Sequence, residues 1–150
     1  MTYEIVPFSP VHVGPLVARL GSQRKSMEGF GNKARPWVRW LVGRSCQVEV
    51  ALIEGRPVAM WGTLGTLAST EVSIWFLVAD DIRDRKFAIA RAAKRTIERI
   101  LLTVDTITSV IVIGDPRARR FIEFLGFTIG EYPIYDAEDR AYFPCRRTRA

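Results

Sequence analysis

The sequence predicts a single α/β domain in which a mixed β-sheet carries helices on both faces. One observation is the run Val110–Ile113, a β-branched apolar stretch that passes through a short break into a helix start at Pro116. A fully apolar strand followed directly by a helix is typical of a central strand covered by helices. A second observation is the hairpin pattern over residues 47–64, where two strand-like runs flank a turn at residues 54–57. The length of 150 residues and the 48% apolar content suit one domain with one core.

The remaining elements follow from hydrophobic periodicity and from the positions of glycine and proline. Strands are expected at residues 3–6, 47–53, 58–64, 72–78, 110–113, 127–129 and 141–143, with residues 132–135 as a continuation of the strand begun at Phe127. Helices are expected at residues 12–20, 36–42, 87–102 and 116–125. Ser9 is the expected N-cap of the first helix, and His12 is expected to be exposed or to cap. Trp37, Trp40 and Leu41 share one helix face and are expected in the core. Residues 104–108 are expected as a link, and a basic tail from about residue 145 is expected to be mobile at its end.

The net charge of +6 is concentrated in the second half of the chain. Residues 1–82 carry eight basic and seven acidic side chains, whereas residues 83–150 carry fourteen basic and nine acidic ones. This distribution favours an anionic partner, with a solvated arginine-rich surface as the equal alternative. The residues that could form a basic face are Arg91, Lys94, Arg95, Arg99, Arg117, Arg119 and Arg120. No base-reading motif accompanies them, so the sequence argues only for nonspecific phosphate contact with nucleic acid.

Several classes of protein are disfavoured. No run approaches the roughly 18 apolar residues of a membrane-spanning helix, and the first residues lack the pattern of a secretory signal. Cys46 and Cys145 lie far apart and are expected as reduced, buried thiols, with one disulfide left open. One histidine and scattered acidic residues give no metal-ligand cluster, so no metal is expected. No serine has the surroundings of a catalytic nucleophile.

A motif in the second half of the chain points to a family. Ala118, Phe121, Glu123, Gly126 and Phe127 follow the spacing Ala-x-x-Phe-x-Glu-x-x-Gly-Phe. Together with the element order, this phrase resembles the GCN5-related N-acetyltransferase (GNAT) superfamily. The resemblance implies a GNAT-like fold in one domain, with the helix before the Gly-Phe pair beside acetyl-coenzyme A.

Two shorter phrases resemble a narrower set of proteins. Phe8–His12 and Trp75–Val78 are similar to segments of GNAT-like proteins of T7-like, short-tailed phages, which are known as internal virion proteins or acyltransferases. This resemblance implies a location in the virion and the host cytoplasm. It also implies partners among portal, adaptor and tail proteins, and it leaves open contact with DNA and a homo-oligomer.

The GNAT phosphate-binding pattern is only partly present. It reads Val-x-Pro-x-x-Arg/Gln-x-x-Gly-x-Gly/Ala and, aligned on Val78, it is matched at Arg83 and Ala88, while Asp80 replaces the proline and Lys86 the first glycine. Glycine lets a backbone approach a phosphate closely, and a lysine side chain obstructs that approach. The residues expected to contact acetyl-coenzyme A are Val78, Arg83, Arg85, Lys86, Ala88, Asp115, Ala118 and Phe121.

The catalytic positions of the GNAT family are also altered. The tyrosine that commonly serves as the acid is replaced by Ile122, and the strand at residues 72–78 has no internal carboxylate to serve as the base. Glu71, just before that strand, and Tyr132 are the candidates that remain. The sequence therefore favours a catalytically degenerate, virion-associated binding protein. An active acetyl-coenzyme A-dependent N-acetyltransferase is the main alternative, and a nonspecific nucleic-acid contact protein is the weaker one.

Overall fold

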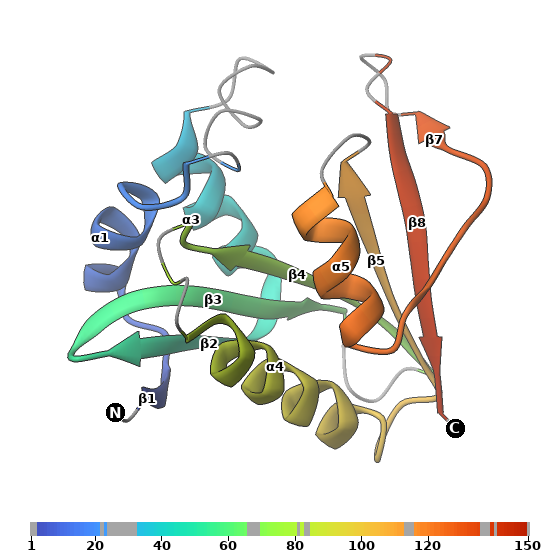
Figure 1. Cartoon of the computed structure of the whole chain (residues 1–150), viewed down its shortest axis with the longest axis horizontal. Helices are drawn as coiled ribbons and strands as arrows, with labels where there is room; N and C mark the ends of the chain where they lie inside the picture. Colours follow the sequence, from blue (N-terminus) through green and yellow to red (C-terminus); the bar gives the residue numbers. More distant parts are fainter. Residues whose placement is uncertain are drawn as a thin grey trace. The chain divides into compact units, whose positions relative to one another are not determined.

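The computed structural model describes residues 3–21, 23, 33–65, 70–80, 82, 85–112, 116–135, 139 and 141–149. The strands are β1 (Tyr3–Pro7), β2 (Ser45–Ile53), β3 (Arg56–Leu64), β4 (Glu71–Val78), β5 (Thr106–Val112), β6 (Thr128–Ile129), β7 (Ile134–Tyr135) and β8 (Ala141–Thr148). The helices are η1 (Pro10–His12, a 3-10 turn), α1 (Val13–Val17), α3 (Ala34–Arg44), α4 (Lys86–Ile100) and α5 (Pro116–Phe124) (Figure 1). The eight strands form one mixed sheet in the order β1-β2-β3-β4-β5-β8-β6, with β7 on β8. The predicted fold class, a mixed sheet with helices, is confirmed.

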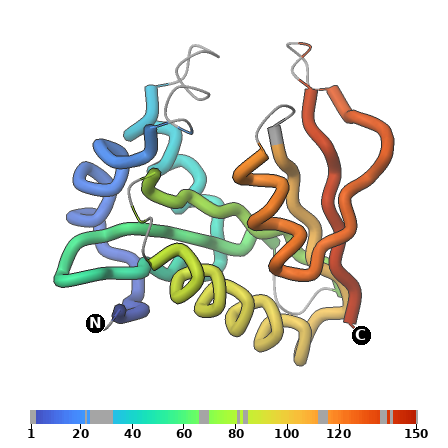
Figure 2. The backbone as a smooth tube through the Cα atoms, in the orientation of Figure 1, coloured from blue at the N-terminus to red at the C-terminus, as the bar shows by residue number. Residues whose placement is uncertain are grey.

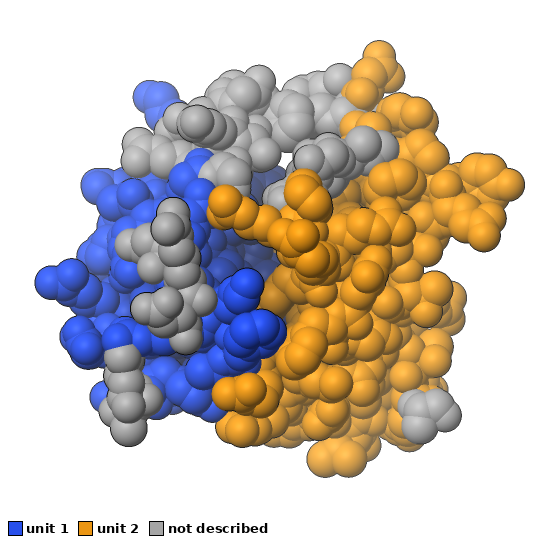
Figure 3. Space-filling model, viewed as in Figure 1, with its two compact units in different colours: residues 1–64, 76–89 blue, residues 65–75, 90–150 orange. Residues whose placement is uncertain are grey.

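The chain divides into two compact units. One unit comprises Met1–Leu64 and Phe76–Ile89, and the other comprises Gly65–Trp75 and Ala90–Ala150 (Figure 3). The boundary therefore passes through β4 and through α4.

The first unit is built on the antiparallel strands β1, β2 and β3. The β2–β3 hairpin predicted from the sequence is confirmed, and its turn has positive φ at Glu54 (53°) and Gly55 (75°). Two consecutive positive φ angles suit a tight turn whose twist matches the strands that it connects. Strand β3 is buried along most of its length, and Met60 and Trp61 are among the largest fully buried side chains. This makes β3 the centre of the core of the first unit.

The second unit is built around β5. Strand β4 pairs with β5 in parallel, and β8 pairs with β5 in antiparallel register along the whole of β5. The backbone tube shows β8 running beside β5 (Figure 2). Helix α5 contributes Ile122 to the core and is followed by buried Leu125 and Phe127, while Gly126 between them has a φ of 89°. A left-handed glycine at this point ends the helix, as the sequence predicted.

Two predictions about the first unit's helices are wrong in part. The first helix does not reach Leu20, because it divides into the turn η1 and the short helix α1, which ends at Val17. Helix α3 buries Leu41 as expected, but Trp40 is 46% exposed.

The reason for the exposed tryptophan is the helix register. The buried face of α3 is formed by Ala34, Val38 and Leu41, and Trp37 and Trp40 lie on the flank beside it. There the two indoles stack on each other at 5.0 Å between ring centroids, and the Arg44 guanidinium lies 4.5 Å from the Trp40 ring centroid.

The last strand, predicted over residues 141–143, is longer than expected and includes much of the predicted basic tail. Strand β8 extends to Thr148, and Cys145 within it is buried. The segment expected as a link belongs to β5 from Thr106 onward, and this longer β5 gives the tail a pairing partner. The chain up to Thr148 is therefore held by a backbone ladder.

Candidate functional site

The parallel pairing between β4 and β5 is short. It covers Glu71–Ser73 and Thr106–Thr108, although β4 continues to Val78. Where the ladder ends, hydrogen bonds from side chains connect the two strands instead of backbone pairs. The Ser73 and Thr108 hydroxyl oxygens lie 2.8 Å apart, and the Ser109 hydroxyl donates to the Ile74 carbonyl at 2.9 Å. Beyond Ile74, this edge of β4 takes part in no described pairing with β5.

The backbone groups of Phe76 and Val78 lie on that edge of β4. Alternate residues of a strand direct their backbone groups to opposite edges, and the Ala79 N–H donates to the Val58 carbonyl of β3 at 2.8 Å. The even-numbered residues Ile74, Phe76 and Val78 therefore share the other edge. They present a carbonyl and an N–H two residues apart, which is the pattern that the N–H and C=O of one residue of a neighbouring parallel strand satisfy.

The side chain of Gln23 satisfies these two backbone groups. Its amide nitrogen donates to the Phe76 carbonyl at 3.1 Å, and its amide oxygen accepts from the Val78 N–H at 2.8 Å. Gln23 is distant in sequence from both partners, by 53 and 55 positions, so no local pattern signals this contact. Sequence reasoning selected Val78 but missed Gln23 and Phe76.

The segment before Gln23 is fastened to the end of β4. The Asp80 N–H donates to the Arg19 carbonyl at 3.0 Å, and Arg19 donates to the Pro57 carbonyl at 3.3 Å. Gly21 has a φ of 53°, and the Asp80 carboxylate occupies the space that a Cβ of residue 21 would take. Only glycine fits both the left-handed backbone and this close approach. These contacts hold Gln23 beside the β4 edge.

The start of α4 follows the site along the chain. Its first turn contains no acidic residue, and the N-terminus of a helix carries a partial positive charge that favours phosphate. Lys86 is exposed with its ammonium 5.2 Å from the Phe87 ring centroid, and Ala88 is half-buried. The Arg85 guanidinium lies 3.7 Å from the Glu54 carboxylate. Arg83 lies outside the described residues.

The other predicted site residues belong to the second unit. Glu71 is exposed and opens β4, at the opposite end of that strand from Val78. Tyr132 is 80% exposed between β6 and β7. Ala118 and Phe121 are half-buried on α5, while Asp115 lies outside the described residues. The structure thus groups Val78, Arg85, Lys86 and Ala88 along one strand–helix connection, and the assignment of Glu71 and Tyr132 to catalysis stays a prediction.

Ile122 occupies the position at which the family's acid was expected. It is 3% exposed and belongs to the core that α5 forms in the second unit. Its apolar side chain therefore has a packing role.

The basic residues of the second unit divide into two kinds. Arg91, Arg119 and Arg120 are exposed, and Arg119 pairs with Glu123 at 3.1 Å. By contrast, Arg147 and Arg149 donate hydrogen bonds to backbone carbonyls that follow α5 and α4. Part of the C-terminal positive charge therefore holds the fold together.

The lone histidine has the capping role that the sequence allowed. The Ser9 N–H donates to His12 Nδ1 at 3.1 Å, and the His12 ring lies edge-on to Phe8. Cys46 and Cys145 are both free thiols, as expected, but only Cys145 is buried and the expected burial of Cys46 is wrong, because Cys46 is exposed on β2. Burial raises the pKa of the Cys145 thiol to about 11.

No described helix has the length and apolar character needed to cross a membrane, and the described part of the chain holds no group of three or more potential metal ligands.

Comparison with solved structures shows the same fold in GNAT acetyltransferases. The aminoglycoside acetyltransferase AAC(6')-Ib in complex with coenzyme A has a TM-score of 0.72 and 16% identity, with 99% of this chain and 95% of that chain covered. Ard1 from Thermoplasma volcanium has a TM-score of 0.75 and 13% identity, with 100% and 99% covered. The spermidine N-acetyltransferase SpeG from Vibrio cholerae has a TM-score of 0.70 and 10% identity, with 97% and 95% covered.

These identities are low, and the likeness is one of fold. No protein-family model matches the chain, and no curated protein matches it in sequence. The GNAT-like fold predicted from the sequence is confirmed.

Proposed function

We propose that this chain binds acetyl-coenzyme A along the edge of β4 that carries Phe76 and Val78 and transfers its acetyl group to an amine. The observation that carries the proposal is the pair of backbone groups at Phe76 and Val78, which already hold an amide in this structure. The pantetheine arm of coenzyme A is an extended chain with two secondary amides. The Gln23 contacts show that this edge takes one donor and one acceptor, which the two amides of the pantetheine arm can supply.

The residues at the start of α4 complement the other end of the ligand. The positive end of the α4 dipole and the cations Arg85 and Lys86 suit a pyrophosphate. Lys86 replaces a glycine of the family pattern, but its ammonium lies over the ring of Phe87, the next residue. Within the described part of this connection, Asp80 is the acidic residue, and its carboxylate packs against Gly21.

The chemistry of transfer requires proton movement. When bound, acetyl-coenzyme A supplies an activated thioester carbonyl for an amine to attack. Glu71, an exposed carboxylate, is the candidate to accept the proton of the amine. Tyr132, an exposed phenol, is the candidate to donate a proton to the departing thiolate of coenzyme A. Both assignments belong to the proposal.

Calorimetry with coenzyme A and acetyl-coenzyme A tests the binding step. We expect saturable binding with a micromolar dissociation constant, followed by release of free thiol when a panel of primary amines is added. Binding without thiol release would favour the catalytically degenerate binding protein. Absence of binding at millimolar ligand would refute the proposal.

The alternatives inferred from the sequence make different predictions. A virion-associated role predicts this chain in purified phage particles, where portal, adaptor or tail proteins would be its partners. A nonspecific nucleic-acid contact role predicts binding to DNA that weakens steeply between 50 and 200 mM salt, on the order of a thousandfold for six phosphate contacts.

A further inference from the structure

Gln23 makes its two hydrogen bonds with the same backbone groups that the proposed ligand needs. The Val78 N–H has one proton and can donate one strong hydrogen bond. It donates to Gln23 Oε1 at 2.8 Å, while Gln23 Nε2 donates to the Phe76 carbonyl at 3.1 Å. A ligand carbonyl and the Gln23 side chain therefore exclude each other at Val78.

The tether of Gln23 strengthens this competition. Its own N–H donates to the Leu20 carbonyl at 3.2 Å, and the neighbouring Arg19 carbonyl accepts from the Asp80 N–H at the end of β4. The side-chain amide is thus present at the edge at a high effective concentration. For the Gln23 amide to leave the β4 edge, the Gln23 side chain must change its rotamer, while the backbone contacts of residues 19 and 20 remain.

We infer that Gln23 sets the affinity of the β4 edge for amide-bearing ligands, because it occupies the edge until the ligand displaces it. This inference rests on the proposed function, with the pantetheine arm of coenzyme A as the displacing group. The adenosine and phosphate part of coenzyme A contains no such amide chain, so its binding is independent of Gln23. Gln23 is therefore an affinity-determining residue with no part in the transfer chemistry.

The test compares Gln23→Met with wild type. Methionine keeps the length of the side chain and removes both hydrogen bonds. The matched control is Gln47→Met, since Gln47 is the other glutamine of the chain and is exposed on β2. Two probes are titrated by calorimetry: coenzyme A, and adenosine 3′,5′-bisphosphate, which lacks the pantetheine arm. Urea unfolding of each variant establishes that it is folded.

The expected result is specific to one variant and one probe. Gln23→Met binds coenzyme A about tenfold more tightly than wild type, because two net hydrogen bonds no longer have to be broken. The affinity for adenosine 3′,5′-bisphosphate is unchanged, and Gln47→Met resembles wild type with both probes. Without ligand, the Val78 amide exchanges its proton about tenfold faster in Gln23→Met, and coenzyme A slows this exchange again.

Other outcomes overturn the inference in distinguishable ways. If wild type and Gln23→Met bind coenzyme A equally, or the variant binds it more weakly, Gln23 does not compete, while the proposed function stands. If both probes change together, the effect is general and the inference fails. If neither protein binds coenzyme A, the proposed function fails and the inference fails with it. An unchanged exchange rate at Val78 would show that Gln23 does not occupy the edge.

Discussion

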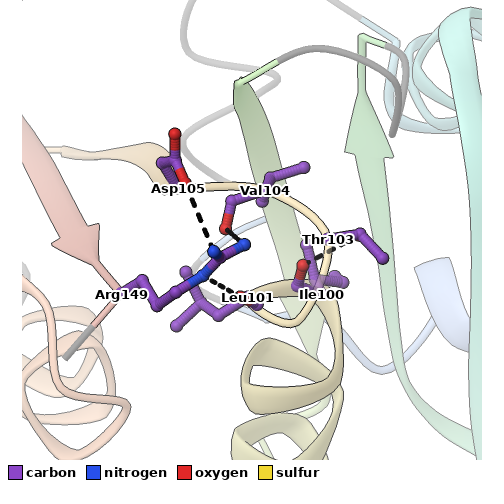
Figure 4. Close-up of polar contacts among 6 residues, drawn as sticks. All are labelled: Ile100, Leu101, Thr103, Val104, Asp105 and Arg149. Carbon is purple, nitrogen blue, oxygen red and sulfur yellow. Dashed lines mark hydrogen bonds and ion pairs between the residues drawn. The ribbon is translucent and has the colours of Figure 1, made fainter.

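Replacing Arg149 with methionine is expected to lower the free energy of unfolding by about 2 kcal/mol. The Arg149 side chain reaches across to the end of α4 (Figure 4). Its Nε donates to the Leu101 carbonyl at 2.6 Å, and its Nη2 donates to the Val104 carbonyl at 3.1 Å. A third contact is the ion pair with Asp105, at 3.5 Å between Nη1 and Oδ1. Methionine keeps most of the apolar stem and removes all three contacts.

The magnitude follows from how far water can replace these contacts. A hydrogen bond to a charged donor contributes about 1.5 to 3 kcal/mol when buried. The Arg149 side chain is 50% exposed, so we take about 1 kcal/mol for each of the two hydrogen bonds. The Asp105 side chain is 65% exposed, and a surface pair of this kind contributes at most about 0.5 kcal/mol after solvent screening. The cation also lies near the negative end of the α4 dipole.

Urea unfolding followed by circular dichroism measures the effect. Arg146→Met is the matched control, because Arg146 is exposed and its side chain leaves the opposite face of β8. We expect it to change the unfolding free energy by less than about 0.5 kcal/mol. Arg149→Lys keeps the charge without the forked donors and should recover less than half of the loss. The reasoning is refuted if Arg149→Met and Arg146→Met are equally stable.

Three further predictions concern other parts of the chain. Gly126→Ala should lower the free energy of unfolding by about 2 kcal/mol, because φ at residue 126 is 89° and Arg147 Nε lies 3.1 Å from the new Cβ. Urea unfolding measures this loss, and a smaller loss of unfolding free energy in an Arg147→Met background would identify the clash with Arg147. The buried Cys145 thiol keeps its proton in the folded state up to a pKa of about 11, against 9.0 for the ordinary thiol. The contribution of the Cys145 thiol to the free energy of unfolding is therefore intact below pH 9 and is lost between pH 9 and 11. Relative to Cys145→Ala, the loss of unfolding free energy over this range should be on the order of 2 kcal/mol in unfolding titrations. Equal dependence of the unfolding free energy on pH in the two proteins would refute this. Ala88→Glu puts negative charge in the first turn of α4 and should weaken coenzyme A binding about tenfold in calorimetry. The control Arg91→Gln changes the net charge by the same amount further along the helix and should weaken coenzyme A binding less. An equal loss of affinity in both variants would argue against a local phosphate site.

The fold was predictable where neighbouring residues determine local structure. The apolar run that begins at Val110 and the turn after Ile53 each indicated a strand that the structure contains, β5 and β3, because strand propensity and turn chemistry act over a few residues. The length of β8 was not predictable in this way. Its second half, from Cys145 to Thr148, is basic and has little hydrophobic pattern, and its strand structure depends on pairing with β5 and on the carbonyls that Arg147 and Arg149 reach.

The candidate site was predictable only in part. Val78 and Lys86 were selected because they belong to a motif that is contiguous in sequence. Gln23 could not be found, since its partners are more than 50 positions away and are backbone groups whose residue types carry no signal. The core position of Ile122 likewise depends on how α5 packs in the second unit.

The pairing of β5 with β8 has a consequence for the order of events during synthesis. Strand β5 leaves the ribosome before α5, β6 and β7, and its antiparallel partner β8 follows all of them. Until then, the backbone N–H and C=O groups on the edge of β5 that β8 will cover have no strand partner. An unpaired apolar strand edge is prone to associate with other chains. Slowing translation between residues 113 and 140 should therefore increase aggregation of nascent chains, whereas slowing it within the β2–β3 hairpin, whose strands emerge consecutively, should have less effect.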